Sequence, residues 1–351
     1  MDNQVPQEYS HIIESNTDSW EAQSSIFESL GNFSLRNVEV FLPNEYYGLD
    51  LIVKKFIGLD QKTSLKFGIP HGAEIGDAKF ANVYGYRTNL STLTYNNPIG
   101  LRNIVNHNVP GRRIPAEHPL LILVEMMSSL GMLSNKKIRD ATLFFPAHQS
   151  VGFDFVNKDY DKEICMKLDS LRSTEGEVEI SLPFLDFELE RHLTYEKFGF
   201  KVVSSGHYKD SKFLSRFINL TTSYKRVASA DAGSHLIYSA AVGCNTEFWN
   251  LGMPLIQQTD SDLHISEPYE IDPTIKELFQ PGKRIDHIQA SQLLGLTNTP
   301  ISQSYWRWLQ KSSIRQDRYS FIEVEGDTLK FAIPQALRRP LVTTLKRVAR
   351  K

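Results

Sequence analysis

The sequence predicts an α/β fold, and residues 199–243 carry the strongest signal for it. This stretch contains an apolar strand at 200–203, a helix with one apolar face at 213–221 and a second strand at 227–230. A glycine turn then leads into a small apolar helix that stops at Gly243, a residue suited to a left-handed helix end. Strand, helix, strand and glycine turn are half of a doubly wound α/β domain with a parallel sheet.

The composition is that of an ordinary water-soluble protein. The 351 residues are 41% hydrophobic and 23% charged, and the net charge of −2 gives no general argument for nucleic acid or acidic substrates. Two cysteines exclude a disulfide scaffold and favour a reducing compartment. The sequence shows no signal peptide and no apolar run near the roughly 20 residues of a membrane helix. We therefore expect a cytoplasmic protein.

A turn of three residues, Gly233, Ser234 and His235, opens the last helix of this stretch. Glycine lets the backbone approach a ligand, and the first turn of a helix leaves amide hydrogens unpaired, so this start suits a phosphate. An ordinary helix cap is the alternative. Gly206 and His207 end the neighbouring strand, and both turns would open at the carboxyl edge of one parallel sheet, where open α/β sheets bind ligands.

The run GFKVVSSGHYKD…FLSRF…VASADAGSHLIYSAAVG resembles the carboxy-terminal domain of GT-B glycosyltransferases, notably enzymes of bacterial capsule and lipopolysaccharide O-antigen synthesis. The resemblance covers residues 140–245 best and residues 60–125 more weakly. It implies two Rossmann-like domains facing a cleft, with the phosphates of a nucleotide-sugar donor held at a Gly-Ser helix start. The nucleotide-sugar is a co-substrate, either a UDP-sugar or a CMP-sugar such as Kdo, and no cofactor is implied.

We expect four segments in the chain. Residues 1–32 are acidic and polar and predict a loosely ordered arm with one short helix. Residues 33–140 would form the N-terminal Rossmann-like, acceptor-side domain, and residues 141–284 the C-terminal, donor-side domain. Residues 285–351 predict an extension of two helices, a hairpin and a last basic helix at 334–351.

Three more residues extend the predicted donor site. The apolar strand that begins at Ala141 breaks at a proline and brings His148 and Ser150 to its end, which the resemblance directs into the cleft. Glu247 follows the phosphate helix, where the resemblance implies an acid bound to a sugar or ribose hydroxyl. The neighbouring Trp249 leaves the alternative that Glu247 covers an edge of the core.

The predicted catalytic residues follow a short strand that ends in Pro-His-Gly: His71, Glu74 and Asp77. A sugar hydroxyl is a poor nucleophile until its proton is removed, so an inverting transfer needs a base. The resemblance implies that a loop near the cleft carries this acid or histidine. The alternative is a turn in which His71 caps a loop and the two acids face water.

Other functions remain open at this stage. The chain has no Walker-type phosphate loop, and Asp260 and Asp262 have the Asp-x-Asp spacing without a preceding apolar strand, so we expect transfer without a metal. Residues 285–351 also have the element order of a winged-helix module, which makes a DNA-binding regulator the alternative. A sugar-nucleotide epimerase on the same fold and a non-catalytic scaffold for glycan assembly are further rivals.

The basic residues of 334–351 more simply suit an anionic membrane surface, at about 1 kcal/mol for each. We therefore expect peripheral contact with the inner face of the plasma membrane and a glycan or lipid-linked acceptor, rather than nucleic acid.

Overall fold

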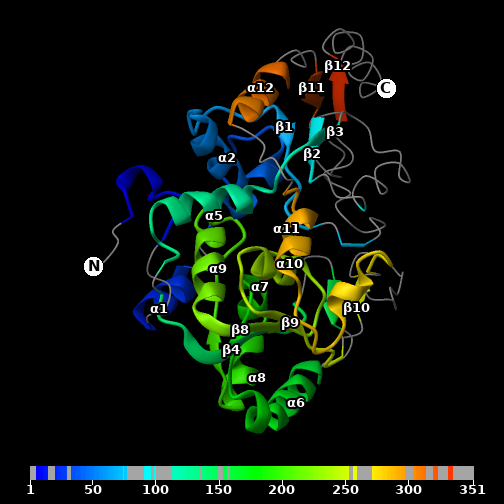
Figure 1. Ribbon diagram of the computed structural model, residues 1–351. Coiled ribbons are helices and arrows are strands. Elements are labelled where there is room, and N and C mark those ends of the chain that lie inside the picture. The colour runs from blue at the N-terminus through cyan, green and yellow to red at the C-terminus, as the bar shows by residue number, and fades with distance from the viewer. Residues whose placement is uncertain are drawn as a thin grey trace, which may run out of the picture.

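The described part of the chain contains two parallel sheets with helices packed around them (Figure 1). The computed structural model describes residues 5–14, 20–29, 33–73, 75–76, 91–95, 99, 113–134, 136–148, 153–155, 159–252, 256–258, 271–296, 303–313, 319–322 and 331–334.

The larger sheet has five strands in the order β7-β6-β4-β8-β9, and every neighbouring pair is parallel. Because β4 lies in the middle, the chain builds first to one side of it and then to the other, and the strand order reverses between β4 and β8. Open α/β sheets bind ligands at the carboxyl ends of the strands at such a reversal. The predicted α/β class with a parallel sheet is confirmed. The strands are β4 (Arg139–Phe145), β6 (Glu177–Ser181), β7 (Lys201–Val203), β8 (Tyr224–Ser229) and β9 (Thr246–Phe248).

Helices cover both faces of this sheet. Residues 141–144 of β4 are all buried, as expected for a parallel strand with no solvent-facing side. Successive side chains enter different cores: Phe144 packs with Ile164 of α6, whereas Leu143 packs with Leu220 of α9. The helices connecting the strands are α6 (Tyr160–Glu175), α7 (Phe184–Glu188), α8 (Arg191–Lys197), α9 (Phe213–Thr222) and α10 (Ser234–Ala241).

The smaller sheet has three parallel strands in the order β1-β2-β3 and lies in the upper part of Figure 1. Two of these strands, β2 and β3, lie in the described part of residues 83–120. Two antiparallel pairs, β5–β10 and β11–β12, complete the strands. The remaining elements are η1 (Gln7–Tyr9), η3 (Leu42–Gly48), α2 (Leu49–Ile57), β1 (Phe67–Gly68), β2 (Ser91–Thr94), β3 (Arg113–Pro115), α5 (Pro119–Ser129), β5 (Phe153–Phe155), β10 (Ile256–Gln258) and η4 (Lys276–Phe279).

The amino-terminal segment packs on the larger sheet, although the sequence predicted a loosely ordered arm for residues 1–32. Ile12 is fully buried in the main core. Gln23, in α1 (Trp20–Ser29), bonds both backbone groups of Ser204 just after β7: its Oε1 accepts from the Ser204 amide at 2.9 Å, and its Nε2 donates to the Ser204 carbonyl at 3.4 Å. This amide side chain therefore extends the end of the sheet much as a strand would.

The carboxy-terminal helices return to the rest of the chain. α11 (His287–Leu293) packs beside α10, and α12 (Gln303–Ser313) packs beside α2. Trp306 of α12 is fully buried, with its ring centroid 5.9 Å from that of Phe67 in β1. Both helices contribute to the main hydrophobic core rather than to a core of their own.

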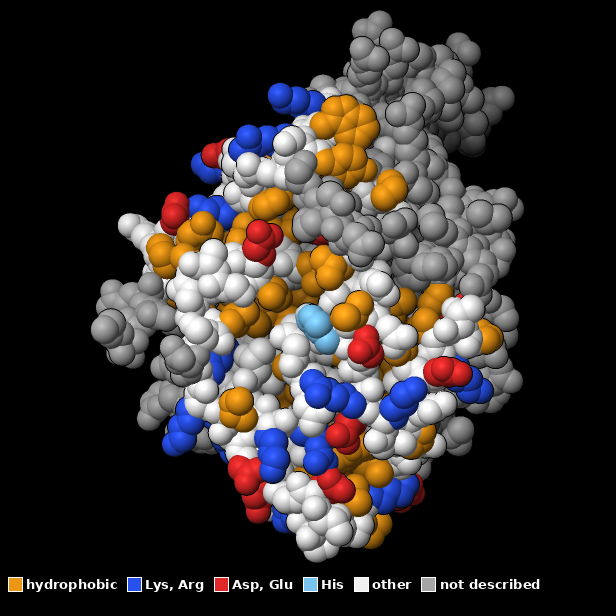
Figure 2. Space-filling model, in the orientation of Figure 1, with side chains coloured by type: hydrophobic (Ala, Val, Ile, Leu, Met, Phe, Trp, Pro, Cys, Tyr) orange, Lys and Arg blue, Asp and Glu red, His pale blue; other side chains and the backbone are white. Residues whose placement is uncertain are grey.

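In the segment where the sequence predicts a hairpin, β11 (Tyr319–Ile322) and β12 (Phe331–Pro334) form an antiparallel pair. The residues between these two strands, and the basic segment after Pro334, lie outside the described residues. Among the residues that are described, no helix combines the length and apolar character needed to cross a lipid bilayer. On the face shown in Figure 2, acidic and basic side chains are interspersed over the part formed by the larger sheet and its helices.

A buried ion cluster fixes the segment in front of α2. The Lys54 ammonium group is fully buried and lies 2.5 Å from Glu39 Oε1 and 2.7 Å from Asp50 Oδ2. Lys54 also donates to the carbonyl of Gln61 at 3.1 Å. Burial raises the pKa of Glu39, and Lys54 opposes this rise. Both buried carboxylates therefore share the buried cation, and Asp50 has a second partner in Arg36 at 2.5 Å.

Candidate functional site

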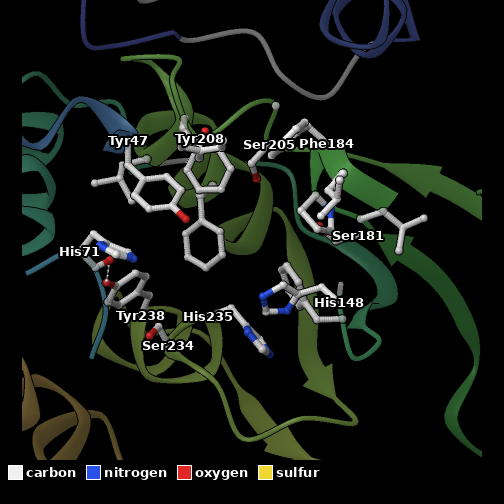
Figure 3. Close-up of a pocket in the computed structure, with 18 of the residues that line it drawn as sticks. Tyr47, His71, His148, Ser181, Phe184, Ser205, Tyr208, Ser234, His235 and Tyr238 are labelled. Carbon is white, nitrogen blue, oxygen red and sulfur yellow. Dashed lines mark hydrogen bonds between the residues drawn. The ribbon is translucent and has the colours of Figure 1, made fainter. Parts of the chain in front are cut away.

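A cavity of about 650 Å³ lies at the carboxyl ends of the larger sheet, where the loop after β1 approaches them (Figure 3). Its wall includes five of the predicted site residues: His71, His148, Gly206, Ser234 and His235. They follow β1, β4, β7 and β8, so four different strand ends contribute to one wall. The volume falls in the range of about 300–1,000 Å³ that small-molecule sites occupy.

The start of α10 leaves its first amides available. Gly233 precedes the helix in an extended conformation, and no side chain among the described residues caps this end. Amide hydrogens in a first helical turn have no partner within the helix, and the helix dipole places about half a positive charge there. With Ser234 and His235 in the same turn, this end of α10 can receive an anionic group.

The His235 ring folds back over Gly233. A Cβ added to Gly233 would lie 2.6 Å from His235 Cε1, so glycine is needed here for the close approach of the histidine. His235 Nε2 lies 2.7 Å from Ser229 Oγ, and its ring stacks on Phe145 with 5.0 Å between ring centroids. Burial, and then the neighbouring His148, lowers the pKa of His235 to about 3. At neutral pH this ring is therefore an uncharged hydrogen-bonding group.

Two hydrogen bonds attach the loop after β1 to the first turns of α10. The Tyr238 hydroxyl donates to the His71 carbonyl at 3.0 Å, which is the dashed line in Figure 3. The Ala73 amide donates to Ser234 Oγ at 2.9 Å. Since Ser234 and Tyr238 are one helical turn apart, one face of α10 holds the backbone on both sides of Gly72.

His118 supports this attachment from behind. Its Nδ1 accepts from the Leu120 amide at 3.0 Å, so the neutral ring carries its proton on Nε2, which lies 2.9 Å from the Tyr238 hydroxyl. Tyr238 therefore accepts from His118 and donates to the His71 carbonyl. Burial, and then His71, lowers the pKa of His118 to about 3. The direction of the whole hydrogen-bond chain is thus fixed at neutral pH.

His71 itself lies on the wall of the cavity, and its ring makes an edge-type contact with Tyr46, with 5.7 Å between centroids and 69° between the ring planes. Burial lowers the pKa of His71 to about 4. The imidazole is therefore neutral at pH 7 and can accept a proton. The two predicted partners, Glu74 and Asp77, lie outside the described residues.

The structure places three of the predicted donor residues away from the cavity wall. Gly233 lies behind His235, and His207 is buried with its ring centroid 3.9 Å from that of Phe184. The Glu247 carboxylate accepts from Trp249 Nε1 at 3.2 Å and lies 3.5 Å from the Arg226 guanidinium. Ser150 lies outside the described residues.

The cavity also contains residues that the sequence did not single out. Tyr47, Tyr208 and Phe184 form an aromatic side, and Ser181 and Ser205 add hydroxyls. The two serines could have been found, because Ser181 ends β6 and Ser205 lies two residues beyond β7, at the same edge as the predicted turns. The aromatic residues come from η3, from the start of α7 and from the loop after β7, and no local pattern marks them.

Within the described ranges, no group of three or more His, Cys, Asp or Glu side chains is placed to hold a metal ion. A scan against models of known protein families and a search of curated proteins both find no match to this chain. The geometry of the cavity therefore carries the functional argument.

Proposed function

We propose that the protein is a glycosyltransferase of the GT-B type, which moves a sugar from a nucleotide donor to a bacterial surface glycan or its lipid-linked precursor. The observation that carries the proposal is the single cavity that gathers His71, His148, Gly206, Ser234 and His235. These residues were selected from the sequence for two separate roles, donor binding and acceptor activation. A transferase needs both roles within reach of one bond.

The donor phosphate would lie at the start of α10. Helix amides, the Ser234 hydroxyl and the neutral His235 ring would surround the charge that develops on the leaving phosphate. Such pre-oriented dipoles offset this charge without a metal ion. Gly206, at a positive φ of 98°, brings its backbone to the same cavity.

The acceptor hydroxyl would lie beside His71. A neutral imidazole can take the hydroxyl proton, but a histidine with a pKa near 4 is a weaker base than one near 7. The imidazolium formed during transfer would therefore need a carboxylate close by. Glu74 and Asp77 are the proposed partners because they follow His71 within six residues.

Nucleotide binding is the first test. UDP, CMP and GDP are each titrated into the full-length protein up to about 100 times the dissociation constant that is being tested for. A DNA duplex is tested in parallel. A ligand that binds only the folded state at this concentration adds about 2.7 kcal/mol of stability, which thermal unfolding detects. We expect at least one nucleotide to raise the melting temperature. A shift with the duplex alone would favour the DNA-binding alternative instead.

Replacement of the proposed base is the second test. His71→Ala should lower the transfer rate by about 10²- to 10⁴-fold, the usual contribution of a positioned acid–base group. Nucleotide affinity should change little, because the phosphate site is built on α10. Glu74→Gln and Asp77→Asn serve as a matched pair, and only the true partner of His71 should lose activity heavily. Near-normal turnover in His71→Ala with one inactive acid variant would make that acid the base.

A further inference from the structure

The backbone of Tyr47 is strained at the cavity wall. Its φ of 58° and ψ of 11° lie in the left-handed region, which costs bulky residues roughly 1–2 kcal/mol. A chain keeps such a conformation only where its surroundings determine it. Strained residues of this kind concentrate at functional sites, which makes the Tyr47 side chain a candidate for a functional role.

The neighbours of Tyr47 hold this conformation from both sides. The buried Glu45 carboxylate accepts four consecutive backbone amides, from residues 36 to 39, at 2.5–3.1 Å. Gly48 packs so closely on Ser211 that a Cβ would overlap the Ser211 carbonyl. The Tyr47 amide itself donates to the Tyr208 carbonyl at 2.5 Å. The turn is thus anchored to the loop after β7, which lies beside it at the cavity.

The Tyr47 ring is clamped, but its hydroxyl is not used by the fold. The ring packs on Phe213, with 4.7 Å between centroids, and lies near His71, at 6.1 Å. Figure 3 shows the hydroxyl directed into the cavity. Burial raises the pKa of Tyr47 to about 12, so the group remains a hydrogen-bond donor at neutral pH. No described residue hydrogen-bonds this hydroxyl, whereas the Tyr238 hydroxyl has two protein partners.

We propose that Tyr47 binds the acceptor sugar directly, through a hydrogen bond from its hydroxyl to a ring hydroxyl next to the reacting one. This assignment rests on the proposed function. The acceptor side is favoured because Tyr47 adjoins His71, whereas the donor phosphate site lies on α10. Tyr46 and Tyr208, with 4.9 Å between ring centroids, add aromatic faces that suit the apolar C–H face of a pyranose. The inferred acceptor group is therefore a sugar ring with a free neighbouring hydroxyl.

Two matched variants of the full-length protein test this assignment, because Tyr47→Phe and Tyr238→Phe each remove one hydroxyl from the same cavity. The probes are methyl glycosides of glucose, galactose and N-acetylglucosamine, and binding is measured by saturation-transfer NMR with and without the nucleotide that binds best. Tyr47→Phe should weaken glycoside binding about tenfold, the value of one lost hydrogen bond. Its melting temperature should stay within about 1 °C of the wild type, since the hydroxyl has no partner in the described fold. Tyr238→Phe should melt a few degrees lower, because it leaves His118 Nε2 and the His71 carbonyl unpaired.

Three results would overturn the assignment: unchanged glycoside affinity in Tyr47→Phe, a melting temperature as low as that of Tyr238→Phe, or no glycoside binding by the wild type. The proposed function fails separately. If no nucleotide binds the wild type while Tyr47→Phe still weakens glycoside binding, the transferase is refuted and the sugar contact of Tyr47 stands.

Discussion

Acid should destabilise this protein through His118, whose neutral form is built into the hydrogen-bond chain to His71. The pKa of His118 is about 3 in the folded state and about 6.5 in the unfolded chain. Between these values the unfolded chain binds a proton that the folded protein does not bind. Stability is therefore complete above pH 6.5 and falls as the pH drops toward 3. At pH 5 the difference of about 1.5 pKa units amounts to about 2 kcal/mol of unfolding free energy.

Urea unfolding at pH 7.5, 6.5 and 5 measures this loss, and His118→Gln is the reference. The reference is needed because other groups also titrate: burial lowers the pKa of His235, which adds to the loss, and raises the pKa of Glu39 and Asp231, which opposes it. Between pH 7.5 and pH 5 the wild type should lose about 2 kcal/mol more than the variant. Parallel pH profiles for the two proteins would refute the reasoning, because His118 would then titrate alike in both states.

Two substitutions test other parts of the structure. Lys54→Met should lower the unfolding free energy by about 3–5 kcal/mol, because Glu39 would be left buried without its cation and Asp50 would keep only Arg36. A loss below about 1 kcal/mol in urea unfolding would contradict the buried cluster. Gly233→Val should push the His235 ring off its place and abolish nucleotide binding in a protein that still folds. Titration calorimetry checks this, and a folded variant with wild-type nucleotide affinity would exclude the start of α10 as the phosphate site.

Elements that are determined by residues close together in the sequence could be predicted well. The strand, helix and glycine turn of residues 199–243 appear as β7, α9, β8 and α10, because apolar spacing and glycine act over a few residues. Gly243 has the expected left-handed conformation, with a φ of 92°. The sequence predicts that the turn at Gly233 lets the backbone approach a ligand. In the structure Gly233 lies close to the His235 ring, a contact that the spacing of residues in the sequence does not specify.

Features that depend on distant segments could not be predicted. Tyr47 and Tyr208 meet across more than 150 residues, and neither lies in a periodic pattern. The packing of the described parts of the amino-terminal segment could not be predicted for a related reason. Their composition is polar, but a few apolar side chains such as Ile12 and one glutamine, Gln23, find partners late in the chain. Composition reports how much apolar surface a segment has, and not where it can be buried.

Segments near both ends of the described chain pack against distant parts of it, and this has a consequence for synthesis on the ribosome. Gln23 hydrogen-bonds Ser204, which is synthesised 181 residues later. The Ile57 carbonyl accepts a hydrogen bond from Arg307, which is synthesised 250 residues later. At about 5–20 residues per second, these delays are roughly 10–40 s and 12–50 s. Part of the surface around each sheet stays exposed while the nascent chain emerges, because α11 and α12 are synthesised after the helices that they cover. This exposed surface remains accessible to chaperones until α11 and α12 have left the exit tunnel. Both parts of the fold therefore gain their last packing only after the helices α11 and α12 have been synthesised.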